Sequence, residues 1–151
     1  MPKLLIFAVC REAIINAQDQ SISAISMLPG LTVPVPPGEP VSEDTIAPLF
    51  FGIAAYWLVQ PEDRGKWFEH RFQIVKPNGE IYPMSTIPLL ADKGNVSVVL
   101  QGVGFPVGLV GVHLVTMDLR EIEPDKEWIR LGEYPMEVFH VTQEEGSVDA
   151  N

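Results

Sequence analysis

Hydrophobic and polar residues alternate along several segments of the chain, and this alternation is typical of β-strands. The segment Trp67–Val75 alternates strictly and ends at a turn formed by Lys76–Gly79. The segment Asn95–Gln101 alternates in the same way. Because successive side chains of a strand point to opposite faces of a sheet, each segment is predicted to have one buried and one exposed face. No amphipathic pattern extends beyond two helical turns, so the sequence predicts an all-β fold.

The N-terminal third of the chain predicts a β-hairpin. Leu4–Cys10 is a continuous apolar run, which indicates a strand buried on both faces. After a polar break at Gln18–Gln20, the segment Ser21–Leu28 resumes a strand pattern. The phase of this second arm changes between Ala24 and Ile25, which predicts a β-bulge.

Later apolar segments predict the remaining strands. Leu49–Val59 is expected to pair with Trp67–Val75, which follows it in the sequence. Leu109–Leu119 carries apolar residues on both faces, so we expect it to be the longest strand and to lie centrally in its sheet. Met136–Val141 is the last predicted strand.

The distribution of the fourteen prolines limits where strands are expected. Pro29–Pro48 is predicted to be an extended loop outside any hydrogen-bonded ladder, because proline lacks a backbone N–H. For the same reason, Pro83 and Pro88 predict an irregular segment at Met84–Leu90. About seven to nine strands remain, which favours an antiparallel β-sandwich, immunoglobulin-like or related, with a small closed β-barrel as the alternative. We expect one domain at residues 1–142 and an acidic polar tail at residues 143–151.

Composition narrows the classes of partner. The chain has 151 residues, with 20 acidic and 10 basic side chains and a net charge of −10, so nucleic-acid binding is disfavoured. Residues 47–59 form the longest apolar stretch outside the N-terminal run, which is too short for a membrane helix of about 20 residues. The apolar run before Cys10 is also shorter than the core of a signal peptide. Cys10 is the only cysteine, which excludes an intrachain disulfide and fits a cytoplasmic protein.

Several of these segments, taken together, carry a resemblance to other proteins. The N-terminal pattern Ala8-x-Cys10-Arg11-x-x-Ile14-Ile15 followed by Ser21–Ile25, the strand ending in Pro77–Gly79, and Phe105-Pro106-x-Gly108 before a long strand resemble a family of short bacterial proteins of unknown function. The resemblance covers most of the chain in order. It implies a single β domain and no known activity, so it transfers no catalytic residue.

Few residues point to catalysis or to metal binding, and we predict no cofactor. His70, His113 and His140 are far apart in the sequence and form no His-x-His pair, so they meet at a metal only if three strands bring them together. Cys10 is a nucleophile only if a histidine lies beside it, and a buried cysteine without a catalytic role is the other interpretation.

Alternating acidic residues suggest one further ion site. Glu121, Glu123 and Asp125 share one face of an extended chain near Asp118, where they form either a calcium site or a solvated turn.

The remaining candidates belong to interaction surfaces. Trp67 and Arg71 lie on one face of their predicted strand, and tryptophan and arginine are enriched where proteins bind each other. Phe139 and Val141 lie on the last strand, which we expect to be an unprotected sheet edge that pairs with a protein partner or with another copy. Pro34-x-x-Pro37 fits a polyproline ligand or a structural loop.

These observations favour a non-catalytic protein-binding or assembly module. The alternative is a β-barrel enzyme that binds a small molecule or metal through His70, His113 and His140.

Overall fold

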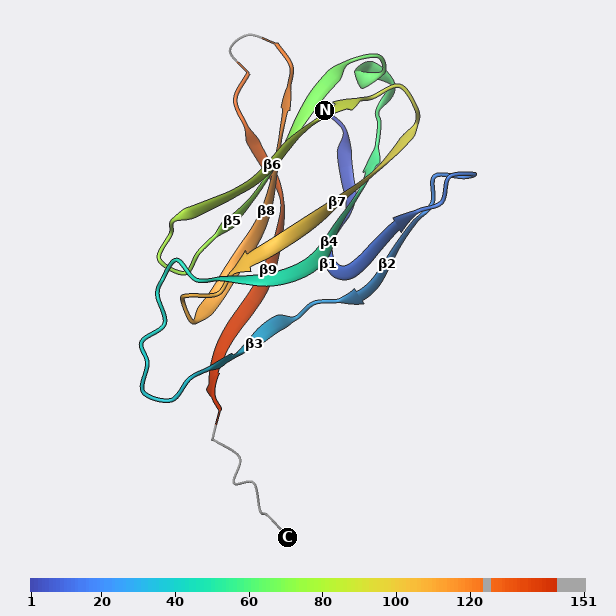
Figure 1. Cartoon of the computed structure of the whole chain (residues 1–151). Coiled ribbons are helices and arrows are strands. Elements are labelled where there is room, and N and C mark those ends of the chain that lie inside the picture. Colours follow the sequence, from blue (N-terminus) through green and yellow to red (C-terminus); the bar gives the residue numbers. More distant parts are fainter. Residues whose placement is uncertain (124–125, 144–151) are drawn as a thin grey trace.

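Nine strands form two sheets in the computed structural model, which describes residues 1–123 and 126–143 (Figure 1). The strands are β1 (Lys3–Ile15), β2 (Ile22–Met27), β3 (Gly30–Val35), β4 (Ile46–Leu58), β5 (Trp67–Val75), β6 (Ile81–Leu90), β7 (Asn95–Pro106), β8 (Gly111–Glu121) and β9 (Ile129–Thr142). One turn of 3-10 helix, η1 (Pro61–Asp63), lies between β4 and β5. Within the described ranges, no helix has the length and hydrophobicity needed to cross a bilayer. The predicted all-β fold is confirmed. The predicted tail lies outside the described residues, apart from Gln143.

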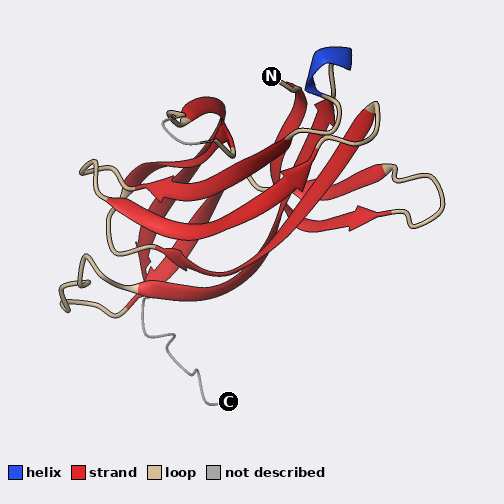
Figure 2. Ribbon diagram, turned by 90° about the horizontal axis from the view of Figure 1, so that it is seen from above, coloured by secondary structure: helices blue, strands red, loops and turns tan. Residues whose placement is uncertain are grey.

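The two sheets share one hydrophobic core. The first contains four strands in the order β2-β1-β4-β7, and the second contains five in the order β3-β9-β8-β5-β6. Seen from above, the curved strands are joined by loops and turns at their ends (Figure 2). Buried side chains from both sheets meet in the core, including Val9, Phe51, Ile53, Trp57, Phe68, Phe72, Met117, Leu119 and Val138.

The alternation predicted for the segment Trp67–Val75 is confirmed in β5. Phe68, His70 and Phe72 are buried, whereas the residues between them are exposed or half-buried. The central position predicted for the late apolar strand is also confirmed, because β8 is the middle strand of its sheet. It is not the longest strand, since β8 has 11 residues and β9 has 14.

One predicted pairing is wrong, and so is the prediction that all strands pair antiparallel. β5 does not pair with β4; it lies in the other sheet between β6 and β8, while β4 lies between β1 and β7. The pairing is also not antiparallel throughout, because β3 runs parallel to β9. Adjacency in the sequence fails here because the chain crosses from one sheet to the other after β4.

Three prolines lie inside edge strands, in segments that were predicted to be a loop or irregular. Pro34 lies in β3, opposite Val141, in a segment predicted to be outside any ladder. Pro83 and Pro88 lie in β6, where the sequence predicted an irregular segment. Both strands are sheet edges, and an edge strand tolerates a residue without an N–H donor because only one of its sides is paired. A shift of register opposite Phe72 and Gln73 also accommodates β6.

The predicted N-terminal hairpin is present, but its bulge is not. The register of β1 with β2 is unbroken from Cys10 opposite Met27 to Ile15 opposite Ile22. The irregular residue is Ser26, whose φ is 55°.

The hairpin crosses the outer face of the four-stranded sheet. The pairing of β1 with β4 ends where Cys10 lies opposite Gly52. A side chain on Gly52 would lie 2.9 Å from the backbone nitrogen of Ala13, so glycine permits this close crossing. The tip of the hairpin reaches β7, where Ser97 Oγ donates a hydrogen bond to the Gln20 carbonyl at 2.7 Å. A second small core lies beneath the hairpin and contains Cys10, Ala13 and Ala54, with Ile22 and Val99 against them.

Candidate functional site

Polar side chains gather on the outer face of the five-stranded sheet, away from the core. Trp67, Glu69 and Arg71 lie on the outward side of β5, and Trp67 is 51% exposed. The register of β5 with β8 places Glu69 opposite Arg120 and Arg71 opposite Asp118. Asp118 lies in turn opposite Arg130 of β9. Three neighbouring strands therefore present oppositely charged residues side by side.

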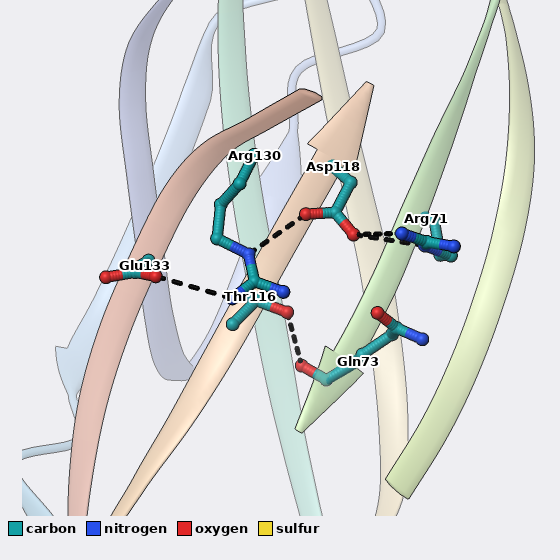
Figure 3. Close-up of polar contacts among 6 residues, drawn as sticks. All are labelled: Arg71, Gln73, Thr116, Asp118, Arg130 and Glu133. Atoms are coloured by element: carbon teal, nitrogen blue, oxygen red, sulfur yellow. Dashed lines mark hydrogen bonds and ion pairs between the residues drawn. The ribbon is translucent and has the colours of Figure 1, made fainter. Parts of the chain in front are cut away.

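Asp118 is the centre of this arrangement (Figure 3). Its Oδ2 accepts hydrogen bonds from Arg71 Nε at 3.0 Å and from Arg71 Nη2 at 2.7 Å. Its Oδ1 accepts a hydrogen bond from Arg130 Nε at 3.0 Å. Although it points away from the core, Asp118 is only 2% exposed, because side chains cover it. The carboxylate holds two guanidinium groups in fixed positions.

The Trp128 ring also helps to hold arginine side chains of this face in place. The guanidinium carbons of Arg71 and Arg120 each lie 4.4 Å from the centre of the Trp128 ring. Arg120 also donates from Nε to Glu69 Oε2 at 2.7 Å. Each of these two guanidinium groups therefore has both an anionic and an aromatic partner. Cation–π contacts of this kind contribute about 0.5–1 kcal/mol at exposed positions.

We name the set Trp67, Arg71, Asp118, Arg120, Trp128 and Arg130 the Arg/Trp face. The sequence predicts that Trp67 and Arg71 share a face, and the structure places them so. The sequence does not predict that these two residues share the face with Asp118, Arg120 and Arg130. The signal that could have revealed this face is the alignment of β5, β8 and β9, which places acidic residues of one strand opposite basic residues of the next.

Phe139 and Val141 lie apart from the Arg/Trp face. Both are exposed on β9, but Arg130 is nine residues before Phe139 on that strand, a distance of roughly 30 Å. The prediction that the last strand is an unprotected edge is wrong, because β9 is paired with β8 on one side and with β3 on the other. Phe139 lies opposite Thr32 in β3.

The structure keeps the three histidines in separate environments. His70 is buried between Trp57 and Phe72, with ring centres 5.2 and 5.9 Å away. His113 is buried against Phe105, and His140 Nε2 lies 2.6 Å from the Val107 carbonyl. Among the described residues, no three side chains of His, Cys, Asp or Glu are placed to hold a metal ion.

The structure also shows the surroundings of the candidate nucleophile Cys10 and of the candidate calcium set. Cys10 is fully buried, its Sγ lies 3.5 Å from the Gly52 carbonyl, and burial raises the pKa of the thiol. A raised pKa is the opposite of what activates a nucleophile. In the proposed calcium set, Glu121 lies 3.4 Å from Lys66 and Glu123 lies 3.6 Å from Lys126, while Asp125 is outside the described residues.

The chain matches no model of a known protein family and no curated protein.

The burial of Asp118 leads to a testable expectation about stability. Replacing Asp118 with Ala leaves Arg71 and Arg130 without their shared anion, so we expect the free energy of unfolding to fall by about 1–3 kcal/mol. Urea unfolding at pH 7 measures this change. Glu123→Gln is the matched control, because it removes a carboxylate from an exposed pair with Lys126 and should cost less than about 0.5 kcal/mol. Equal effects of the two substitutions would show that the Asp118 network contributes no special stability.

Proposed function

We propose that this protein is a non-catalytic protein-binding module and that the Arg/Trp face is its contact surface. The observation that carries the proposal is the exposed Trp67 on the same face of β5 as Arg71. Arg71 and Arg120 on this face are held in place by Asp118, Glu69 and Trp128. Tryptophan and arginine are the residues most enriched at energetic hot spots of interfaces. Arginines that are already ordered lose less conformational entropy when a partner binds.

The chemistry of this face also suggests what it binds. Its charges are compensated within the sheet, so a partner does not need a large charge of either sign. A surface with an exposed aromatic residue and fixed hydrogen-bond donors suits a folded protein surface that offers carbonyl or carboxylate acceptors and one apolar anchor.

We also propose that the fold is an immunoglobulin-like sandwich. Without β2, β3 and β6, the two sheets have the order β1-β4-β7 and β9-β8-β5. This order corresponds to strands A-B-E and G-F-C of an immunoglobulin-like sandwich, which supports that assignment. The resemblance to short bacterial proteins of unknown function, and a cytoplasmic location based on the single buried cysteine, remain proposals.

A capture experiment tests the contact surface. The full chain, immobilised and exposed to extract from its native cells, should retain a protein that the variant Trp67→Ala does not retain. Truncating an exposed hot-spot tryptophan typically weakens binding by more than about 2 kcal/mol, or roughly thirtyfold. Ile25→Ala is the matched control, because Ile25 is an exposed apolar residue of the other sheet. Retention of the same proteins by wild type and by Trp67→Ala would contradict the proposal.

A further inference from the structure

The two sheets have four edge strands, and three of them carry features that hinder pairing with another chain. β2 and β3 have six residues each, β2 contains Ser26 in the left-handed region, and β3 contains Pro34. β6 contains Pro83 and Pro88. Short strands, prolines and irregular backbone are the usual means by which natural sheets prevent edge-to-edge association.

The fourth edge, β7, lacks these features over most of its length. It has 12 residues, none is charged, and its only proline is the last residue, Pro106. No Asp, Glu, Lys or Arg occurs between Lys93 and Asp118, although the whole chain carries a net charge of −10. The neighbouring strand β4 is also uncharged. Along β7 the negative surface of the protein is therefore interrupted.

The hydrogen bonds of β4 define which groups of β7 are free. Val59 N donates to the Gly94 carbonyl at 2.9 Å, in the register that places Leu58 opposite Asn95. Because residues of an antiparallel strand turn alternately toward and away from their partner, the even-numbered residues bond to β4. The odd-numbered residues Val99, Gln101 and Val103 therefore direct their N–H and C=O groups outward.

The exposed side chains around these residues are apolar. Phe50 is 72% exposed and lies opposite Val103, which is 66% exposed. The hairpin tip contacts the earlier part of β7 at Ser97, and the register with β4 shifts just beyond Val103. The regular segment with outward backbone groups therefore runs from Val99 to Val103, with the exposed Gln101 at its centre and the side chain of Val99 packed against the small core beneath the hairpin.

We propose that two copies of this chain form a dimer by antiparallel pairing of their β7 strands, with Gln101 on the twofold axis. In this register Gln101 lies opposite its own copy, and Val99 lies opposite Val103 of the second chain. The uncharged edge allows two chains of charge −10 to approach each other without placing like charges in contact. Twofold pairing uses the β7 edge of each chain, so no β7 edge remains for a third chain. The assembly therefore closes as a dimer instead of continuing as a fibre.

The proposal goes beyond the contact surface described above and is independent of it. β7 lies in the four-stranded sheet and the Arg/Trp face lies on the five-stranded sheet. A dimer would therefore display two Arg/Trp faces and bind a repetitive partner with higher avidity. Trp67→Ala should leave the mass in solution unchanged, so the two proposals fail separately.

The mass of the full chain in solution tests the dimer. Light scattering coupled to size-exclusion chromatography should give the mass of two chains for the wild type. Gln101→Lys places two positive charges directly opposite each other across the axis and should give the mass of one chain. Gln101→Pro removes an outward N–H without removing a hydrogen bond to β4, and should have the same effect. Thr32→Lys adds the same charge to the edge strand β3 and should remain a dimer.

A cross-link provides a second measurement that does not depend on tolerance of proline or lysine. Gln101→Cys introduces an exposed thiol into a chain whose native Cys10 is fully buried. Opposed residues in a hydrogen-bonded antiparallel pair have Cα atoms about 5.5 Å apart, which is within disulfide range. Mild oxidation should therefore yield a covalent dimer, whereas Thr32→Cys should not. A wild-type protein that is a monomer at high concentration would overturn the proposal. So would a dimer that persists in Gln101→Lys and Gln101→Pro and that is not cross-linked in Gln101→Cys.

Discussion

Lowering the pH from 8 to 5 is expected to destabilise the protein by about 2 kcal/mol through His70 alone. Burial lowers the pKa of His70 from 6.5 to about 4, because the charged imidazolium is disfavoured away from water. At pH values between 4 and 6.5, His70 is therefore protonated in the unfolded chain and neutral in the folded chain. The stabilising effect is complete above pH 6.5, falls as the pH drops through this window, and is lost below about pH 4, where the total loss reaches about 3.4 kcal/mol.

The environment of His70 makes this effect measurable. Its ring is fully buried, and neither ring nitrogen has a hydrogen-bond partner in the described part of the chain. Trp57 Nε1, whose ring lies beside it, is also without a partner there. Protonation therefore places a charge among aromatic side chains with no counter-ion. Burial also lowers the pKa of His113, which adds to the dependence in the same direction.

Urea unfolding at pH 5, 6, 7 and 8 measures the dependence. His70→Phe keeps an aromatic ring between Trp57 and Phe72 but cannot titrate, so its free energy of unfolding should vary with pH by about 2 kcal/mol less than that of the wild type. If both proteins lose stability to the same extent between pH 8 and 5, His70 is not the group responsible.

Gly102→Ala is expected to cost about 1–3 kcal/mol, because the space for its methyl group is already filled. The added carbon would lie 2.3 Å from Phe51 Cζ, on the core side of β7. The Phe51 ring is fully buried and packs edge-on against Phe105, with ring centres 5.8 Å apart, so it has little room to move. Gly94→Ala is the control, since a methyl group there meets nothing within 4 Å.

A double variant tests the cause of the Gly102 effect. Phe51→Leu shortens the side chain that the new methyl group would meet, so it should cost less in the Gly102→Ala background than in the wild type. Thermal and urea unfolding of the four proteins give this coupling energy. Strictly additive effects would show that backbone entropy, and not the contact with Phe51, explains the cost.

The residues that were predicted well are those whose signal is local. The alternation of Phe68, His70 and Phe72 with outward residues follows from the period of a strand, and the structure confirms it. The apolar character of β8 on both faces indicated its central position for the same reason. These patterns reflect burial, which each segment records in its own sequence.

The residues that were predicted poorly depend on register between distant strands. Arg71 and Asp118 are 47 residues apart, and nothing in either segment identifies the other as its partner. The pairing of β3 with β9 was missed because Pro34 argues against a ladder, yet an edge strand accommodates it. Proline content therefore indicates an edge at least as well as it indicates a loop.

The parallel pairing of β3 with β9 also constrains when the protein can finish folding. Gly30 and its partner Glu137 are 107 residues apart, so during synthesis β3 emerges long before the strand that it needs. Contacts between such distant segments are costly in chain entropy and form late, which slows folding. Changes near residue 142 therefore act on the closing step of the folding reaction, even though they lie close to the end of the chain.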